Sequence, residues 1–407
     1  MTLQKQTEAL AADLRAQGFK AQPFHAGMDT PTKSKLQDTF MKSKDLIIVA
    51  TIAFGMGVDK PDIRSVVHFN IPNSLESYSQ EVGRAGRDGK KSLCMFYVCG
   101  EDIHLREIFA RGDLPSRDSV RALLEDIFDP MTVKLPLGSD IKVSHTTQSR
   151  DFDIRATTLS NVYAQLELTH GLIRATTPIY TKYSYKANGS YTSKLNTDKS
   201  PAASAIKVHG KSAKTLYHLD VDIAASRSQL ERSDILHKLN DWNDEGVIEL
   251  KPSGVLNVYK ILKKLPKTST EIEILTSAIY ALMESREKEA LERSKMILDL
   301  VTSNKCFTRS IANHFGDDLP GKTDCGHCTY CLTRKPIRIV TPPPPRFNKS
   351  AFKAILSQIP DRDDARFLAK VAFGIHSPRI TTLKLGRNPI FGSMEDHQFI
   401  VCFELSH

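Results

Sequence analysis

The chain of 407 residues is poor in cysteine and aromatic residues and has no long apolar run. It holds seven cysteines and one tryptophan, and 7% of its residues are aromatic. Because no stretch of about 18 consecutive apolar residues occurs, the sequence predicts no membrane-spanning helix. Residues 1–5 lack the basic and then apolar pattern of a secretory leader, so we expect an intracellular protein. Four of the cysteines cluster, which favours a metal site in a reducing compartment over a disulfide framework.

Positive charge, by contrast, is in excess. Lysine and arginine together number 56 against 47 acidic residues, which gives a net charge of +9 and an isoelectric point near 9.0. This balance favours a polyanionic partner, although a basic surface that only keeps the protein in solution is the alternative. The composition is otherwise ordinary for a globular protein, and the length predicts two to four domains.

A pair of arginines stands between glycines in the segment QEVGRAGRDG, residues 80–89. The segment follows a helical run at 75–79 and precedes an apolar strand at 93–98. With this spacing, Arg84 and Arg87 can lie on one face of a helix end. A guanidinium binds phosphate through two hydrogen bonds, so the pair suits a γ-phosphate or a nucleic-acid backbone. A solvated charged turn is the alternative.

The motifs before these arginines occur in a characteristic order. HAGM at residues 25–28 is followed by VATIAFGMGVDKPDI at 49–63 and then by SYSQEVGRAGRDGK at 77–90. These segments resemble motifs IV, V and VI of lobe two in the RecQ helicases of superfamily two, and the resemblance covers residues 1–110. It implies an α/β fold, with a RecA-like parallel-sheet lobe at the N-terminal end.

The resemblance also implies roles for individual residues. Arg87 is the first choice for an arginine finger and Arg84 the second, while Gln80 would lie beside the nucleotide or couple it to DNA. Gly57 and Asp59, in the motif V loop, would bind the nucleotide or take part in that coupling. A structural role for Asp59, as the cap of the next turn, is equally open.

Lobe one of such a motor is not recognised in the sequence. We find no glycine loop that would cradle a triphosphate, no Asp-Glu-x-His run for magnesium, and no apolar strand before the first predicted helix at 7–14. We therefore expect the C-terminal part of a helicase, with ATP and Mg²⁺ bound only when lobe one is present. We expect this chain alone to hydrolyse no ATP.

The middle of the chain predicts a winged-helix-like region. Around Tyr180, Lys182 and Tyr183, aromatic residues interleave with lysines, which suits base stacking with phosphate contact, although a half-buried strand is the alternative. Further on, we expect a helix, a strand at 247–250, a tight turn at 251–254 and a partner strand at 255–259. The helix is acidic, so DNA contact is expected from the hairpin and its flank, at Lys251 and Lys260. A domain that only positions its neighbours is the alternative.

Three cysteines recur at every third position, Cys325, Cys328 and Cys331, and Cys306 is the natural fourth ligand of a tetrahedral zinc site. Four thiolates leave no coordination position for a reacting water, so the zinc should be structural. Residues 296–331 resemble the RecQ zinc-binding subdomain. The substitute ligands are His314 and His327, and unpaired buried thiols are the alternative. The remaining cysteines lie in apolar patterns and predict core positions: Cys94, Cys99 and Cys402.

The predicted winged helix precedes the cysteines, an order similar to the type-four branch of RecQ, and residues 372–379 resemble the C-terminal module of that branch. We divide the chain accordingly: lobe two at 1–112, a helical connector at 113–154, the winged-helix-like region at 155–266 with a flexible linker at 188–214, the helical zinc module at 267–336, a proline-rich linker at 337–348, and a small C-terminal domain at 349–407.

The leading hypothesis is the C-terminal part of a RecQ-like, ATP-dependent helicase that moves three-prime to five-prime and unwinds DNA in repair, recombination or replication. Single-stranded DNA and duplex junctions would be its partners, and the nucleus its location in a eukaryote, or otherwise the cytoplasm. A non-catalytic zinc and winged-helix DNA-binding protein is the alternative, and a protein scaffold is a third. The candidate DNA contacts are His25, Lys60, Tyr180, Lys182, Tyr183, Lys251 and Lys260.

Overall fold

The computed structural model describes residues 4–54, 58–213, 216–339 and 345–404. These fall into two compact units. The first consists of Met1–Gly112, Met283–Ile375 and Pro389–His407, and the second of Asp113–Leu282 and His376–Asn388. None of the helices in these ranges is both long and apolar enough to cross a membrane.

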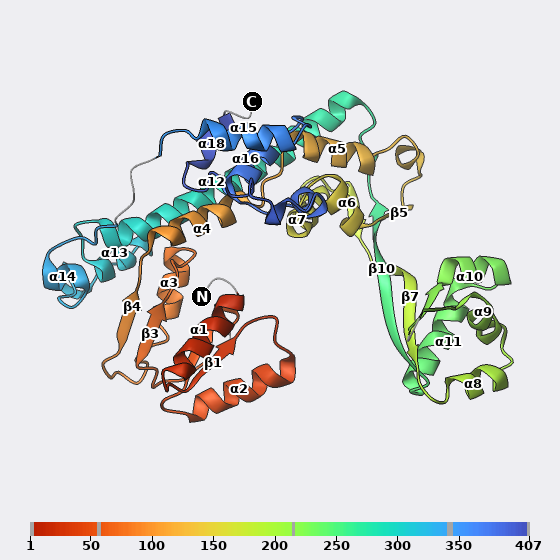
Figure 1. The fold of residues 1–407 in the computed structure, drawn as a ribbon, viewed down its shortest axis with the longest axis horizontal. Helices are drawn as coiled ribbons and strands as arrows, with labels where there is room; N and C mark the ends of the chain where they lie inside the picture. The colour runs from red at the N-terminus through yellow and green to blue at the C-terminus, as the bar shows by residue number, and fades with distance from the viewer. Residues whose placement is uncertain (1–3, 55–57, 214–215, 340–344, 405–407) are drawn as a thin grey trace. The chain divides into compact units, whose positions relative to one another are not determined.

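The first unit begins with two strand–helix–strand repeats (Figure 1). Each repeat forms a parallel strand pair, β1 with β2 and β3 with β4, as predicted for lobe two. The two pairs are not hydrogen-bonded to each other within the described residues, so the parallel sheet is interrupted. The elements are α1 (Gln4–Ala16), β1 (Ala21–Phe24), α2 (Thr30–Lys42), β2 (Ile47–Ala50), β3 (Ser65–His68), α3 (Leu75–Val82), β4 (Leu93–Phe96) and α4 (Gly100–Arg111).

Local sequence explains where the helices of these repeats begin. The Asp29 carboxylate accepts the backbone N–H of Thr32 at 2.8 Å and caps α2, and Pro31 lies in the first turn, where a missing N–H costs nothing. Ser74 caps α3 by accepting the N–H of Ser77 at 3.2 Å. The start of α3 is therefore fixed a few residues before the two arginines.

The rest of the first unit is helical. The C-terminal part of the long α12 packs against α3 and the segment before it, through a core that contains Ile71, Leu75, Ile297, Leu300 and Val301. The remaining helices of this unit are α13 (Phe307–His314), α14 (Thr329–Thr333), α15 (Lys349–Gln358), α16 (Ala365–Phe373) and α18 (Phe399–Glu404), while α12 (Ser269–Thr302) begins in the second unit.

A nearly buried ion-pair network joins helices of the first unit that lie far apart in sequence. Glu287 of α12 pairs with Arg111 of α4 at 3.4 Å and with Arg366 of α16. Both guanidiniums lie over the ring of Phe399 in α18, at 4.7 Å and 5.5 Å. Residues beyond the proline-rich segment are therefore packed into the first unit. The predicted domain boundaries remain predictions.

The second unit is built around a sheet in the order β5-β10-β7-β9-β8, with β6 also paired to β10. Its elements are α5 (Arg117–Ile127), β5 (Asp140–Val143), α6 (His145–Asp151), α7 (Ala156–Leu168), β6 (Ile173–Ala175), β7 (Ile179–Ala187), α8 (Tyr191–Thr197), α9 (Pro201–His209), β8 (Lys211–Ala213), β9 (Leu216–Asp220), α10 (Val221–Ser228), α11 (Arg232–Asp244), β10 (Ile248–Ile261) and α17 (Pro378–Thr382).

The predicted hairpin at 247–259 is not formed. One continuous strand of 14 residues, β10, replaces it and pairs antiparallel with β7. Pro252 lies where β10 pairs with β7 and with no other described strand, a position that tolerates proline. Gly254 has φ +66°, and a Cβ there would lie 2.5 Å from Thr181 Oγ1. Proline and glycine, which predict a turn locally, are accommodated in a strand because the distant β7 pairs with it.

The predicted flexible linker at 188–214 contains two helices, α8 and α9, and the strand β8. Ser200 caps α9 by accepting the N–H of Ala203, and Pro201 lies in its first turn. Ala203 and Ile206 are buried in the same core as Trp242. The segment appears polar in sequence because its buried side chains are mostly small.

Candidate functional site

The two arginines lie in a turn after α3, whereas their spacing predicted a position on one face of a helix end. Helix α3 ends at Val82, and the chain then turns through residues 83–90, which we name the arginine turn. Gly86 has φ +64°, and a Cβ there would lie 2.8 Å from Ser92 Oγ and 2.9 Å from the Lys90 carbonyl oxygen. This backbone conformation with this close approach requires glycine.

The arginine turn is tied to the motif V loop. The N–H of Gly86 donates to the Ile63 carbonyl oxygen at 3.0 Å, and that of Asp88 donates to the Pro61 carbonyl oxygen at 3.2 Å. Arg64 adds a side-chain link, pairing with Asp88 at 2.6 Å and donating to the Lys91 carbonyl oxygen at 3.1 Å. Sequence reasoning missed Arg64, because nothing in its spacing marks it as a link between the two motifs.

Arg87 forms an ion pair with Asp59, with 2.5 Å between Nη1 and Oδ1, and its Nε donates to the Gly83 carbonyl oxygen at 3.3 Å. The side chains of Arg87 and Asp59 are 41% and 84% exposed, so the pair is not buried. Exposed pairs of this kind contribute only about 0–1 kcal/mol. Asp59 thus has a role that the sequence did not suggest, as the partner of the predicted finger.

The other residues that were predicted to contact the nucleotide are less well defined by contacts than Arg87 is. Arg84 is half-buried, and its guanidinium forms no hydrogen bond or ion pair with the residues that the structure describes. Gln80 is exposed on α3. Gly57 lies outside the described residues, so its predicted role is not located.

A pocket of about 260 Å³ lies within the first unit, beyond the carboxyl ends of β2 and β3. This is where open α/β sheets commonly bind ligands. His68 and Glu81 meet there at 2.5 Å, and Arg106 donates to the Asn73 side chain. Burial lowers the pKa of Arg106. A guanidinium beside amide and hydroxyl side chains could hold an anion. The lining residues are Thr51, Ile52, His68, Asn70, Ile71, Pro72, Asn73, Glu81, Arg106 and Phe109.

Two of the predicted DNA contacts in the first unit are buried. His25 is 6% exposed and its Nε2 lies 3.1 Å from Glu8, while Lys60 is 7% exposed and pairs with Asp62 at 2.8 Å. Lys60 Nζ also donates to the Met41 carbonyl oxygen at 3.2 Å. Neither side chain can reach a DNA backbone from this position, so the prediction of contact is wrong for both.

Of the predicted DNA contacts in the second unit, one is buried and the other four are exposed. Tyr183 is buried in the core under β7, so it cannot stack on a base. Lys260 pairs with Asp140 at 3.1 Å, where β10 runs beside β5. Tyr180, Lys182 and Lys251 are exposed, and the register of β7 and β10 brings them to one face of the sheet.

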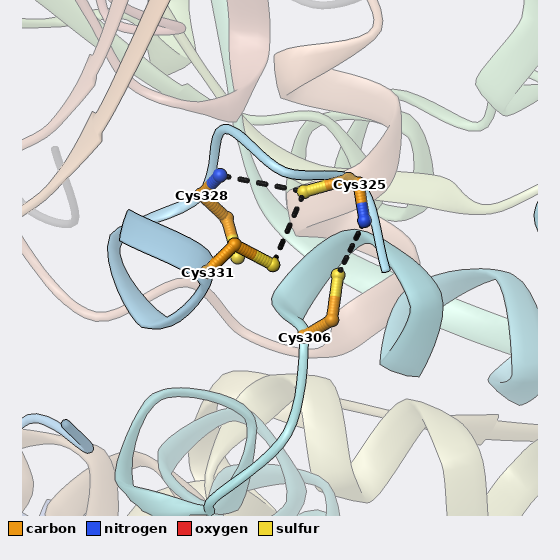
Figure 2. A group of neighbouring side chains, drawn as sticks. All are labelled: Cys306, Cys325, Cys328 and Cys331. Atoms are coloured by element: carbon orange, nitrogen blue, oxygen red, sulfur yellow. Dashed lines mark hydrogen bonds between the residues drawn. The ribbon is translucent and has the colours of Figure 1, made fainter. Parts of the chain in front are cut away.

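The four predicted zinc ligands come together. The Sγ atoms of Cys306, Cys325, Cys328 and Cys331 all lie within 4.8 Å of one another (Figure 2). Backbone N–H groups point at the sulfurs: the N–H of Cys325 donates to Cys306 Sγ at 3.3 Å, and that of Cys328 donates to Cys325 Sγ at 3.3 Å. Such bonds stabilise thiolates, the form that binds metal.

The pKa values of these thiols differ strongly. Burial raises the pKa of Cys325, but hydrogen bonds from Thr308 and from backbone N–H groups outweigh it and bring the value to about 6. Burial, with the neighbouring thiols, raises the pKa of Cys331 to about 12. Four sulfurs this close cannot all ionise without a cation among them, so the cluster fits a tetrahedral, thiolate-liganded Zn²⁺.

The substitute ligands are engaged elsewhere. His314 Nε2 lies 2.5 Å from Glu76 of α3, and His327 Nδ1 lies 2.8 Å from the Cys325 carbonyl oxygen. Of the cysteines predicted in the core, Cys402 is buried, but Cys94 and Cys99 are exposed. Cys94 lies on β4 and Cys99 is the N-cap residue of α4, and neither side chain is covered, so the prediction is wrong for them.

The sequence also contains a glycine loop pattern that sequence reasoning overlooked, GDDLPGKT at residues 316–323. A phosphate loop follows a strand and opens a helix. This segment instead follows helix α13, contains the single turn Pro320–Lys322 and leads to Cys325. It lies inside the zinc module, with Asp318 paired to Arg309 at 2.9 Å, and it lacks the surroundings of a triphosphate site.

The zinc module packs directly on the helix that leads into the arginine turn. Leu75 of α3 belongs to one core with Ile297 and Val301 of α12, and Phe307 and Ile311 of α13 pack against it. Hydrogen bonds from Ser74 and then His314 lower the pKa of Glu76 to about 2. The position of α3 therefore depends on the cysteine-bearing module.

Comparison with protein families gives two matches. The family described as helicase conserved C-terminal domain matches residues 2–89, and the family described as RecQ zinc-binding matches residues 268–332. The first match ends at the arginine turn, and the second contains all four clustered cysteines.

Several curated proteins are similar to this chain. ATP-dependent DNA helicase Q-like 5 of Arabidopsis thaliana is 30% identical over 346 residues, which cover 79% of this chain and 36% of that protein. ATP-dependent helicase wrn-1 of Caenorhabditis elegans is 42% identical over 110 residues, with coverages of 27% and 10%. ATP-dependent DNA helicase Q4 of Mus musculus is 41% identical over 114 residues, with coverages of 28% and 9%.

The chain thus spans 36% or less of the length of these three relatives. Among solved structures, a DEAD box protein from Methanococcus jannaschii is 30% identical, with 25% of this chain and 28% of that chain covered and a TM-score of 0.23. The match to the Arabidopsis protein, over 346 residues, is too long to lie within lobe two, whereas the match to the mouse protein covers 114 residues. Membership of the type-four branch stays a prediction.

Proposed function

Because the chain belongs to the RecQ family of superfamily two helicases, as a C-terminal part, we propose that it is the second half of an ATP-dependent DNA helicase. The relatives named above are described as ATP-dependent helicases, and two of them as DNA helicases. In this proposal, lobe one would hold ATP and Mg²⁺, and this chain would supply the groups that sense the triphosphate. DNA would be the substrate.

The observation that carries the proposal is the exposed guanidinium of Arg87 on a turn with a fixed backbone. The turn is anchored by the Gly86 and Asp88 hydrogen bonds and by Arg64. An arginine finger needs such a rigid backbone support. It lowers the barrier of the reaction because its cation is already directed at the negative charge that develops in the transition state. An arginine on an unanchored surface segment would stabilise the transition state less, because ordering its side chain would cost conformational entropy.

The Asp59 pair is compatible with this role. A phosphate carries more charge than a carboxylate and accepts two hydrogen bonds from one guanidinium. We propose that Asp59 holds Arg87 in the absence of nucleotide and is exchanged for the γ-phosphate when the lobes close. Arg84 would contribute a second cation, and Gln80 would contact the nucleotide or couple it to DNA.

The zinc would be structural. Cys306, Cys325, Cys328 and Cys331 would hold it, which fixes α13 and α14 around one point. A bound Zn²⁺ supplies cross-linking here and no reactive water, because four thiolates complete its tetrahedron. Through α13 and the end of α12, the module would then hold α3 in place.

We further propose that the complete motor moves three-prime to five-prime on single-stranded DNA, as the family resemblance implies, and acts in the nucleus if the source is a eukaryote. A non-catalytic DNA-binding protein is the second candidate. The Arg87–Asp59 pair favours it, since a finger that kept this partner permanently would sense no phosphate.

Addition of lobe one separates these candidates. The chain alone should hydrolyse no ATP, whereas the same chain joined behind the lobe one of a RecQ relative should show DNA-stimulated ATP hydrolysis. It should also unwind a duplex that carries a three-prime single-stranded tail. A completed protein that folds and binds DNA but hydrolyses no ATP would reject the motor and favour the second candidate.

A further inference from the structure

Among the described residues of the second unit, helices pack against one face of the sheet formed by β10, β7 and β9. Under that face, Tyr183, Tyr185 and Leu219 share a buried core with Ile235 and Trp242 of the helical layer. Figure 1 shows α9, α10 and α11 beside these strands. Because neighbouring residues of a strand point to opposite faces, the residues between the buried ones lie on the other side of the sheet.

That other side, which we name the open sheet face, is exposed. Cross-strand pairs place Tyr180 opposite Val255, Lys182 opposite Ser253, and Lys186 opposite Glu249. Further across the sheet, His218 of β9 pairs with Lys211 of β8. All of these side chains are exposed, and Tyr180 and Val255 are exposed by 38% and 41%. Its residues are Tyr180, Lys182, Ser184, Lys186, Lys211, His218, Asp220, Glu249, Lys251, Ser253 and Val255.

The charge of this face is positive on balance, with four lysines against two carboxylates. Lys251 pairs with Glu249 at 2.9 Å. Asp220 of β9 lies opposite Lys182, and its carboxylate accepts the N–H of Ile223 at 3.1 Å, whereas Lys182, Lys186 and Lys211 form no ion pair with any described residue. Lys182 and Lys186 lie on one strand with Lys251 between them on the next, at steps of roughly 6.6 Å along the sheet. A row of free cations at the surface is the pattern expected for contact with a chain of phosphates.

One end of the row is apolar. The Tyr180 ring contacts Tyr183 edge to face, with 6.4 Å between ring centroids, and lies beside Val255. Tyr180 is 38% exposed, so part of its side chain is accessible to a planar group. Uncovered sheets that combine an aromatic side chain with surrounding cations bind unpaired bases, because every base has a π-face.

We propose that the open sheet face binds single-stranded nucleic acid, with phosphates on Lys182, Lys186 and Lys211 and one base on Tyr180. The inference deepens the proposed function, since it names the strand that a DNA helicase of this family would hold here. A duplex would be read by an element inserted in its groove, which a flat sheet does not provide.

The test uses the full chain and a fluorescent oligothymidylate, with binding measured by anisotropy between about 50 and 200 mM salt. The variant K182Q/K186Q removes two charges from the open sheet face. The matched control K199Q/K207Q removes two charges from exposed positions at and before α9, away from that face. The lysines changed in both variants are exposed, so both variants should fold as the unchanged chain does. Circular dichroism checks this.

We expect K182Q/K186Q to weaken binding about tenfold at the lower salt and to reduce the salt slope by about 1.4, at about 0.7 for each phosphate contact. The control should bind as the unchanged chain does. Tyr180→Leu should weaken binding roughly fivefold or more without changing the salt slope, because stacking releases no counterions.

Equal losses in K182Q/K186Q and K199Q/K207Q would overturn the inference, since only total charge would then matter. Loss of duplex binding with single-strand binding retained would also overturn it. If the unchanged chain bound no oligothymidylate, the open sheet face would have no such role, yet ATP hydrolysis by the completed motor would still test the proposed function separately.

Discussion

The arginine turn and the open sheet face both present positive charge, but they hold it in opposite ways. At the arginine turn, Arg87 pairs with Asp59, and Asp88 pairs with Arg64 from outside the turn. Arg84 forms no ion pair with a described residue, but the backbone of the turn is anchored to the motif V loop. On the open sheet face, Lys182 and Lys186 have no such partner among the described residues. Paired arginines in a fixed turn suit one phosphate at one place, whereas free lysines in a row suit a flexible chain of phosphates.

The two regions also differ in what supports them. The arginine turn follows α3, which packs on the zinc module, while the open sheet face belongs to a sheet with its own core around Trp242. If the two regions are supported independently, a change in the support of one should leave the other intact.

Removal of the zinc ligands should affect the first region and spare the second. Cys325→Ser combined with Cys328→Ser should lose zinc and unfold residues 285–335, because binding energies of structural zinc reach about 10 kcal/mol or more. Hydrogen exchange should then rise in α13 and α3 but stay unchanged in β7 and β10. Metal content and exchange rates check this. A double variant that remained folded without zinc would refute the site.

Gly86→Ala should lower the free energy of unfolding of the first unit by about 1–3 kcal/mol. The matched control is Gly89→Ala, because Gly89 also has positive φ, at +76°, but nothing lies within 4 Å of an added Cβ. The larger loss should be at Gly86, measured by urea unfolding, with single-stranded DNA affinity unchanged in both variants. Equal losses would mean that the contact with Ser92 and Lys90 does not constrain the turn.

The smallest effect concerns the contact between α3 and the zinc module. The pKa of Glu76 is lowered from 4.5 to about 2 in the folded chain, so its ionised form stabilises the fold above pH 4.5. That contribution falls as the pH drops from 4.5 towards 2. Glu76 is 46% exposed, so the effect should stay below about 1 kcal/mol.

We therefore expect Glu76→Gln to be slightly less stable than the unchanged chain near neutral pH and to approach it as the pH falls through that window. Urea midpoints measured at several pH values check this. A difference that grew as the pH fell would contradict the assigned direction.

Those parts of the fold and site that depend on local sequence could be predicted. The order of motifs IV, V and VI gave the parallel strand–helix repeats, and the spacing of Cys325, Cys328 and Cys331 gave the sulfur cluster. These predictions were confirmed because residues close together in the sequence determine the features. A strand ends in a loop, and closely spaced cysteines bring their sulfurs to one point.

The predictions that failed concern features that depend on partners far away in the sequence. Pro252 and Gly254 predict a turn, but β7 pairs across them and makes a strand. Lys60 is polar and was expected at the surface, yet Asp62 and the Met41 carbonyl oxygen satisfy its charge where it is buried. The pairing of Asp59 with Arg87 likewise depends on two loops meeting, which no spacing within either loop reveals.

The most direct test is ATP turnover by the motor completed with lobe one, compared between the unchanged protein and Arg87→Ala. We predict a loss of turnover on the order of a thousandfold or more, with DNA affinity nearly unchanged, because the guanidinium acts on the transferred phosphate and not on DNA. Turnover that stayed at the level of the unchanged protein would show that Arg87 remains with Asp59 and senses no triphosphate.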